Sequence, residues 1–374
     1  MLRFLTSGES HGKCLVAILE GMVAGLTIDE ADINCELARR QEGYGRGGRM
    51  TIEKDRVEIL SGVRQKRSIG GPIALLIPNK DFKINELPVV KRPRPGHADL
   101  VGALKYGRED IRDVLERASA RETAARVAVG AVCKILLKEF GVDIVSHVVS
   151  IGGVKADTIG MTFDEIKKAA KDSPMHCASK NVTQKMMARV DEARAAKDTI
   201  GGIFEVLVKG VPVGLGSFVH YDRRLNAKLG AAILSIQAVK GVEIGMGFEV
   251  SKTLGKQVHD EIFYDGKKGF YRKTNRAGGF EGGVTNGETL VLRAATKPYA
   301  TLMSPLQSVH IESKKKEVAT VERSDVTAVP ACGVVAEAMV SFELANSFME
   351  KFGGDSLEET LRNFKGYLRQ IEEF

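Results

Sequence analysis

The chain has 374 residues and a net charge of +7, from 55 lysines and arginines against 48 acidic residues. This length suffices for one large domain or two average ones, and the basic balance favours nucleic acid or anionic metabolites as partners. The five cysteines include no Cys-x-x-Cys pair, which excludes zinc ribbons and thioredoxin motifs and favours reduced, mostly buried thiols.

The first predicted elements are a strand over residues 1–7 and a second apolar run over 15–23, joined by a turn over 8–13. A signal sequence needs a longer apolar stretch before Glu9, and no apolar run approaches the length of a membrane span. We therefore expect a soluble cytoplasmic protein without a membrane partner.

The turn over 8–13 carries Glu9, Ser10 and His11 between two glycines. It is not a phosphate-binding P-loop, because the spacing before its Gly-Lys pair is one residue short and a cysteine replaces the Ser or Thr. His11 is open to two interpretations: an ordinary turn residue, or a proton donor near neutral pH beside Ser10.

A loop rich in glycine and arginine follows a helix predicted over 29–41. Residues 43–48 match Gly-x-Gly-x-x-Gly by letter, but a helix rather than a strand precedes them, so the dinucleotide-binding interpretation fails. A solvated basic loop and a nucleic-acid segment stay open, although only Tyr44 could stack on a base. A mobile lid over an anionic small molecule fits better. The cations of such a lid are Arg40, Arg46 and Arg49.

Residues 92–99 form a stiff turn, in which two prolines and a glycine hold His97 in a defined place. A helix of small apolar residues is then predicted over 115–140 and is expected to be buried. Its first turns carry Arg117, Ser119 and Arg121. These groups either form an anion site at a helix N-terminus or pair with neighbouring carboxylates, and the stretch alone leaves both interpretations open.

The other elements follow from alternation and helical spacing. The expected strands are 57–62, 72–78, 142–152, 203–208 and 289–295, and the expected helical sections are 160–198, 225–239, 332–348 and 356–373. Three helices rich in small residues indicate a buried helical layer with sheets outside it. The order strand pair, long strand, buried helix occurs in 1–140 and again in 200–350, which predicts an internal pseudo-repeat without support from residue identities. His176 and Cys177 are too few for a metal site, so no metal is expected.

Eight motifs occur in an order that one protein family shares. They are Gly8-Glu9-Ser10-His11-Gly12, Arg40-Gln41-x-Gly43-Tyr44-Gly45-Arg46-Gly47-x-Arg49, Arg94-Pro95-Gly96-His97-Ala98-Asp99, Glu116-Arg117-Ala118-Ser119-Ala120-Arg121-Glu122-Thr123, Gln237-Ala238-Val239-Lys240-Gly241-Val242-Glu243, Gly278-Gly279-x-x-Gly282-Gly283, Lys297-Pro298-x-x-Thr301 and Arg323-Ser324-Asp325. The sequence resembles the chorismate synthase family over essentially its whole length. Ala118 stands where many members have serine, and Thr327 stands where many have cysteine. These two departures affect only the single contacts that each side chain would make.

The resemblance implies a carbon-oxygen lyase that removes phosphate and a ring proton from 5-enolpyruvylshikimate 3-phosphate. This 1,4-anti elimination gives chorismate, in the last common step of the shikimate pathway to the aromatic amino acids. Reduced FMN is the implied cofactor, with no net redox change. The implied fold is α+β, a β-α-β sandwich with buried helices between antiparallel sheets, in one domain over 1–374 that assembles as a homotetramer. Because obvious extra segments are lacking, we expect an external flavin reductase.

The resemblance also implies roles for single residues. The catalytic residues are His11 near the leaving phosphate, His97 near the flavin and Asp325 for proton removal. The cofactor-binding residues are Arg117, Ala118, Ser119, Gln237, Ala238, Gly282, Lys297, Pro298, Tyr299, Ala300, Thr301 and Arg323. The residues for substrate or NADP are Ser10, Arg40, Arg46, Arg49 and Arg121. Of these, we expect Arg40 and Arg46 to hold substrate rather than the nicotinamide nucleotide.

The implied substrate carries two carboxylates and a phosphate, so its site needs several fixed cations, a task that suits arginine. Two alternatives are a stand-alone flavin reductase and a basic nucleic-acid-binding protein. The nucleic-acid alternative leaves the two histidines in rigid turns and the glycine-rich segment 278–283 unexplained. We therefore expect a small anionic substrate and no nucleic-acid partner.

Overall fold

The computed structural model describes residues 1–48, 52–267 and 269–374, and its strands form two main antiparallel sheets. The first sheet has the order β1-β2-β6-β3, from Arg3–Ser7, Cys14–Glu20, Ile73–Pro78 and Glu58–Ser61. The second has the order β10-β15-β9-β7-β8, from Val239–Ile244, Leu290–Thr296, Gly202–Lys209, Asp143–Ile151 and Val154–Lys155. The predicted α+β class is confirmed.

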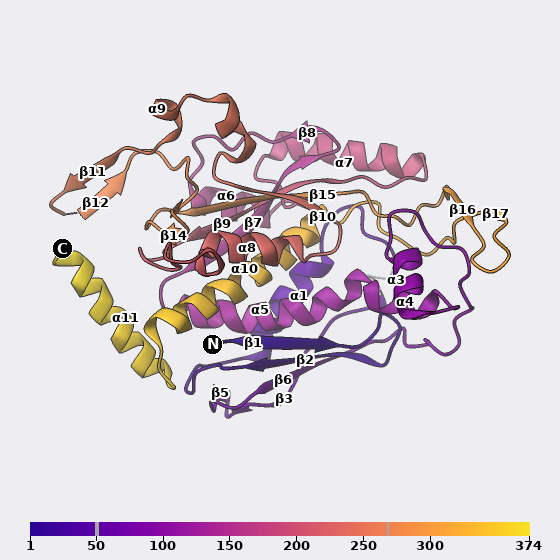
Figure 1. The fold of residues 1–374 in the computed structure, drawn as a ribbon, viewed down its shortest axis with the longest axis horizontal. Helices are drawn as coiled ribbons and strands as arrows, with labels where there is room; N and C mark the ends of the chain where they lie inside the picture. Colours follow the sequence, from indigo (N-terminus) through magenta and orange to yellow (C-terminus); the bar gives the residue numbers. More distant parts are fainter. Residues whose placement is uncertain (49–51, 268) are drawn as a thin grey trace.

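Helices lie between the two sheets (Figure 1). The helices of this layer are α1 (Glu30–Gln41), α5 (Thr123–Lys138), α8 (Leu225–Leu234) and α10 (Val329–Phe352). Helix α5 packs on β2 and β6 of the first sheet, whereas α10 packs on β7 and β9 of the second. Strand β15 presents Leu290, Leu292 and Ala294 on one face, and all three are buried. This is expected because alternate side chains of a strand point to the same face of the sheet.

Helices α5 and α10 pack against each other so closely that only glycine fits at one contact. A Cβ added to Gly130 of α5 would lie 2.3 Å from the Cβ of Ala338 in α10 and 2.7 Å from its carbonyl oxygen. Real carbon atoms do not approach so closely. The small side chains seen in the sequence are therefore needed for helix contact and not only for burial.

The expectation that no apolar run approaches a membrane span is wrong for α10. With 24 residues, this helix is long and apolar enough to cross a membrane by length and composition alone. However, 89% of its most apolar window is buried inside the chain, which is the environment of a core helix.

The remaining elements cover the outside and the ends of these layers. The helices are α3 (Asp99–Tyr106), α4 (Arg112–Ala118), α6 (Phe163–Lys171), α7 (Lys180–Ala195), α9 (Gly255–Val258) and α11 (Leu357–Glu372), with 3₁₀ turns over Ala120–Glu122, Tyr221–Arg223 and Gly247–Lys252. The short strands pair as β4–β5 (Val63–Arg64, Arg67–Ser68), β11–β12 (Ile262–Asp265, Gly269–Arg272), β13–β14 (Phe280–Glu281, Val284–Thr285) and β16–β17 (Gln307–Val309, Lys316–Val318).

The helix predicted over 115–140 is interrupted at Ser119, which corrects the sequence analysis. Helix α4 ends at Ala118, and Ser119 has extended backbone with ψ 141°. The Ser119 hydroxyl accepts a hydrogen bond from the backbone N–H of Arg121, so the serine caps a new turn instead of continuing the helix. Arg117 therefore lies in the last turn of α4, where the helix dipole favours cations, and not at a helix N-terminus that would attract an anion.

Two other helical predictions also need new boundaries. The helix expected over 225–239 ends at Leu234, where Ser235 donates its hydroxyl to the carbonyl of Ala232 at 2.6 Å. Val239 then begins strand β10, as its β-branched side chain favours. The section expected over 160–198 is two helices, α6 and α7, rather than one.

A buried carboxylate, Glu337 of α10, joins four elements. It accepts hydrogen bonds from Arg39 of α1 at 2.7 and 2.8 Å, and from the backbone and hydroxyl of Ser146 in β7 at 2.7 and 2.6 Å. Lys134 of α5 forms a further ion pair with it. Burial raises the pKa of Glu337, but Arg39 and Lys134 outweigh this effect and hold the pKa well below its usual range.

We predict that Glu337→Gln destabilises the protein by roughly 1–3 kcal/mol at pH 7, because the partly buried cations of Arg39 and Lys134 then share only the Glu36 carboxylate. Since the native pKa is depressed, the contribution is fully present above the ordinary pKa of 4.5 and is lost progressively as the pH falls from there toward the native pKa. Urea unfolding at pH 7 and at a pH well below 4.5 measures both effects. The matched control is Glu343→Gln on the same helix, where burial raises the pKa and removal of the charge should cost nothing. Equal losses in both variants would contradict the prediction.

Candidate active site

The turn between β1 and β2 places His11 against helix α4. Its ring Nδ1 lies 2.9 Å from Glu116 Oε1, and its backbone N–H donates to Glu116 Oε2 at 2.7 Å. The backbone N–H of Ser10 donates to the Glu116 carbonyl at 3.0 Å. Asn79 supports the turn from the other side, since its amide donates to the Gly12 carbonyl at 2.7 Å. The position of His11 is thus fixed by residues far from it in the sequence.

Asp81 connects His11 with Arg323. Its Oδ2 lies 3.9 Å from His11 Nε2 and 3.1 Å from Arg323 Nη2, and its Oδ1 lies 2.9 Å from the ammonium of Lys83. The hydrogen bond from Lys83 is the main cause that lowers the pKa of Asp81. Two residues predicted for the site therefore meet at one ionised carboxylate.

A buried pair of arginines lies behind the turn that carries His11. Arg121 binds both oxygens of Asp55 at 2.6 and 2.7 Å, and Arg40 lies 3.3 Å from the same carboxylate. Arg40 also donates to the Thr123 hydroxyl, and burial lowers its pKa to about 10. Arg121 Nε donates to the same Asn79 that holds the turn. Its Nη2 is buried and makes no hydrogen bond within the described parts of the chain.

Arg46 and Asp325, both predicted for the site, form an ion pair at 2.8 Å. The backbone N–H of Gly47 donates to the other Asp325 oxygen at 2.6 Å, which joins the loop after α1 to the segment before α10. Arg49 of the same loop lies outside the described residues, so its predicted role stays a prediction.

The turn that carries His97 is organised by Asp99. This carboxylate lies 2.5 Å from His97 Nδ1 and accepts hydrogen bonds from Arg94 Nε at 2.8 Å and Nη2 at 3.0 Å. Arg94 also donates to the hydroxyl of Thr301 at 2.7 Å. The ammonium of Lys297 contacts the carbonyl of Gly96 in the same turn. Both ends of the predicted 297–301 segment therefore contact the turn of His97.

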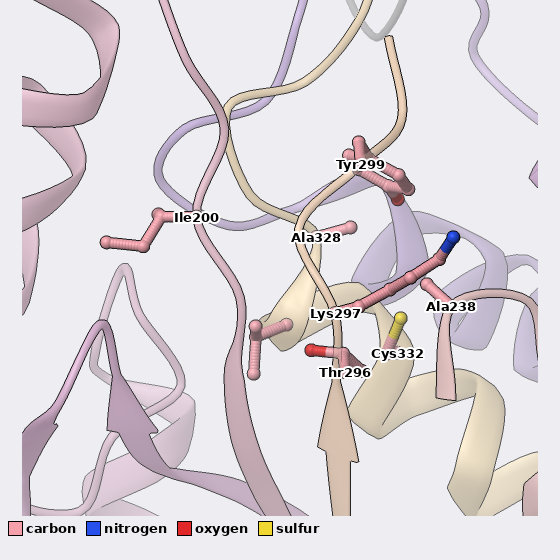
Figure 2. Close-up of a pocket in the computed structure, with 8 residues that line it drawn as sticks. Ile200, Ala238, Thr296, Lys297, Tyr299, Ala328 and Cys332 are labelled. Carbon is pink, nitrogen blue, oxygen red and sulfur yellow. The ribbon is translucent and has the colours of Figure 1, made fainter. Parts of the chain in front are cut away.

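A small pocket lies beside this segment (Figure 2). Lys297 and Tyr299 extend from the chain that leaves β15, with Ala238 and Cys332 close by. The cavity has a volume of about 10 Å³, far below the roughly 300–1,000 Å³ of most ligand sites. Burial raises the pKa of Cys332 to about 11 and also raises that of Tyr299, whereas it lowers the pKa of Lys297.

Hydrogen bonds join this pocket to the turn of His11. Arg117 donates to the carbonyl of Thr6 at 3.0 Å, the Thr6 hydroxyl donates to Glu122 at 2.8 Å, and the Gln237 amide donates to Glu122 at 3.3 Å. The hydroxyl of Ser119 lies 3.2 Å from that of Ser10. The Lys297 backbone N–H donates to the Ala238 carbonyl at 2.9 Å. The two predicted histidines are thus connected partly through residues predicted for the site, and partly through Thr6 and Glu122, which were not predicted for it.

Gly282 is the predicted residue that one chain does not bring to this region. It lies in the β13–β14 hairpin, where its nearest neighbour is Phe218. In Figure 1 that hairpin lies toward the opposite end of the long axis from α4. Its predicted contact with the cofactor is therefore not seen within the single chain and stays a prediction.

Sequence reasoning missed several carboxylates and an amide. Asp55, Asn79 and Asp81 lie in segments without a recognisable motif, and their importance depends on contacts with arginines far away in the sequence. Glu116 and Asp99 stand inside two of the eight motifs, but neither was predicted as a partner of a histidine. The sequence feature that could have identified them is a carboxylate close to a histidine or an arginine in a rigid turn.

Comparison with known proteins places these observations in one family. A family model described as chorismate synthase matches residues 2–349. Chorismate synthases from Geobacter sulfurreducens and Geotalea uraniireducens are 52% and 53% identical to this chain, and each alignment covers 100% of both sequences. A crystal structure of chorismate synthase superposes with a TM-score of 0.84 at 42% identity, covering 100% of this chain and 99% of that one. The chain belongs to the chorismate synthase family.

Proposed function

We propose that this protein converts 5-enolpyruvylshikimate 3-phosphate to chorismate by 1,4-anti elimination of phosphate and a ring proton. Family membership supports an enzyme of the lyase kind in aromatic amino acid biosynthesis. The single observation that carries the assignment to this site is the meeting of His11 and Arg323 at Asp81. A proton donor and a fixed cation side by side are what the departure of a phosphate group requires.

The charges around His11 match an anionic substrate. Arg121 Nη2, beside the Asn79 that holds the turn of His11, is buried, lies 4.0 Å from Glu53 and makes no hydrogen bond within the described residues. Arg323 is largely exposed and could bind a carboxylate or phosphate in place of Asp81. Arg40 and Arg46 are proposed to complete the cationic surface for substrate, with a nicotinamide nucleotide as the alternative ligand.

The proposed division of roles follows from these positions. His11 donates a proton to the leaving phosphate, and the arginines neutralise the negative charge that develops on it. Asp325, whose oxygens are held by Arg46 and Gly47, supports removal of the ring proton. His97 lies next to the 297–301 segment and is proposed to stabilise the cofactor region.

Reduced FMN is the proposed cofactor, and two observations fit it. The side-chain oxygen of Gln237 is buried and accepts no hydrogen bond within the described residues, so it can accept one from a ligand N–H. Ala238 has φ +70°, a backbone state that a non-glycine residue adopts at a cost and that often marks functional turns. Gln237, Ala238, Lys297 and Tyr299 would hold the group. When bound, reduced FMN would supply electron density transiently, which side chains cannot do.

The assembly and cellular setting belong to the same proposal. The position of Gly282 away from the other predicted cofactor residues and the small pocket fit a site completed by a second copy, and the number of four copies rests on the family resemblance. A β-α-β sandwich in one domain is supported by the packing of α5 and α10 between the sheets. The pseudo-repeat, the cytoplasmic location and the external flavin reductase stay predictions.

The proposed reaction is tested by anaerobic incubation of the protein with photoreduced FMN and substrate, with chorismate followed by its absorbance. We expect His11→Ala to lower kcat roughly 10²–10⁴-fold, the usual effect of losing a general acid, with FMN still bound. The control is His220→Ala, which removes an exposed histidine paired with Asp222. Near-normal turnover by His11→Ala would remove this residue from the mechanism, and no chorismate from the unaltered protein would refute the function.

The cofactor placement has its own test. We expect Ser119→Trp to weaken FMN binding at least about tenfold, because an indole at the hydroxyl that contacts Ser10 would fill the space between α4 and the turn of His11. Flavin fluorescence titration measures the affinity, and circular dichroism checks the fold. Ser61→Trp on the exposed edge strand β3 should bind FMN normally. An unchanged affinity for Ser119→Trp would contradict the placement.

A further inference from the structure

The two histidines of the site share one arrangement of hydrogen-bond partners. Each presents its ring Nδ1 to a buried carboxylate that begins or belongs to a helix. His11 Nδ1 lies 2.9 Å from Glu116 of α4, and His97 Nδ1 lies 2.5 Å from Asp99 of α3. The carboxylate side chains are both 0% exposed. Buried carboxylates need partners, so each histidine and its carboxylate form a unit.

An arginine stands behind each carboxylate. Arg112 Nη1 lies 3.5 Å from Glu116 Oε1, and Arg94 binds both oxygens of Asp99. Burial raises the pKa of both carboxyl groups, but the histidine and arginine partners lower it overall, for Asp99 well below its usual range. Both groups are therefore ionised near neutral pH.

An ionised carboxylate only accepts hydrogen bonds, so the ring nitrogen that faces it must carry the proton. This assigns Nδ1–H to His11. It also assigns Nδ1–H to His97, although Arg94 Nη2 lies 3.0 Å from the same nitrogen, because that guanidinium N–H can point to Asp99 Oδ1 at 3.0 Å instead. Nε2 is then the ring atom that stays available for proton exchange in both residues. In His11 this atom lies on the side of Asp81, Lys83 and Arg323.

We propose that Glu116 and Asp99 are positioning residues for the elimination, which fix the orientation and the Nδ1–H form of His11 and His97 so that Nε2 faces the reactants. The proposal rests on the function proposed above for the two histidines. Glu116 has a second task, because it also accepts the backbone N–H of His11 and so places the whole turn. Asp99 likewise accepts the backbone N–H of Arg94 at 3.0 Å.

The test replaces each carboxylate by its amide. Glu116→Gln and Asp99→Asn keep the shape, but their NH₂ groups can donate to Nδ1 and favour the opposite ring form. We expect kcat to fall roughly 10–100-fold with KM changed less than about twofold, the effect of losing an orienting partner rather than a substrate contact. The conservative variants Glu116→Asp and Asp99→Glu keep the charge and should recover part of the loss. Asp113→Asn, on the exposed side of α4, should behave like the unaltered protein.

A second measurement separates orientation from mere stability. In ¹⁵N spectra of protein labelled at histidine, we expect a protonated Nδ1 for His11 and His97, assigned by the loss of signals in His11→Ala and His97→Ala. The amide variants should show a new population with a bare Nδ1. A bare Nδ1 in the unaltered protein, or wild-type kcat in both amide variants, would overturn the proposal.

Failure of the proposed function gives a different result. If the unaltered protein forms no chorismate with substrate and photoreduced FMN, the function fails whatever the spectra show. If it forms chorismate and the amide variants lose kcat without any change in the ring nitrogens, the function stands and the positioning role of the carboxylates is refuted. The spectra of the unaltered protein keep the test decisive even where an amide variant unfolds.

Discussion

The ion pair between Glu337 and Arg39 connects the core of the molecule with its site. Glu337 holds α1, α5 and β7 against α10 from a position without water, where an unpaired charge would cost several kcal/mol. The residue after Arg39 is Arg40, which binds the carboxylate of Asp55 on the site side of the same helix. Two consecutive arginines in the last turn of α1 therefore form ion pairs with different parts of the molecule, Arg39 with Glu337 in the core and Arg40 with Asp55 at the site.

Most cations of the site are already paired with carboxylates of the chain itself. Arg40 and Arg121 share Asp55, Arg46 binds Asp325, and Arg323 binds Asp81. Such pairs hold the arginines in fixed geometry before a ligand arrives, so that little side-chain entropy is lost on binding. The same ion pairs also oppose ligand binding, because the negative charges of a ligand have to compete with the carboxylates for the arginines. An anion with a single charge would compete poorly, which favours a substrate with several.

The sequence predicted the elements of the core well, because small and β-branched residues repeat there with clear periods. It also indicated Ser10, His11, His97 and the 297–301 segment through motifs. What it missed depends on contacts across the fold: Asp55 and Asp81 have no local signal, and their partners come from distant segments. The break at Ser119 was missed because the capping hydrogen bond to Arg121 competes with a helix that the surrounding residues favour.

The contact between Gly130 and Ala338 has a mechanical consequence. Because backbone touches side chain there without a gap, α5 and α10 cannot slide past each other unless they first separate. Because α5 packs on the first sheet and α10 on the second, this contact also links the two sheets. The loops that carry His11, His97 and Arg46 are attached to this core through polar contacts at its rim. Any movement that admits a ligand is therefore expected in these loops, whose usual timescale is nanoseconds to microseconds, rather than between the two helices.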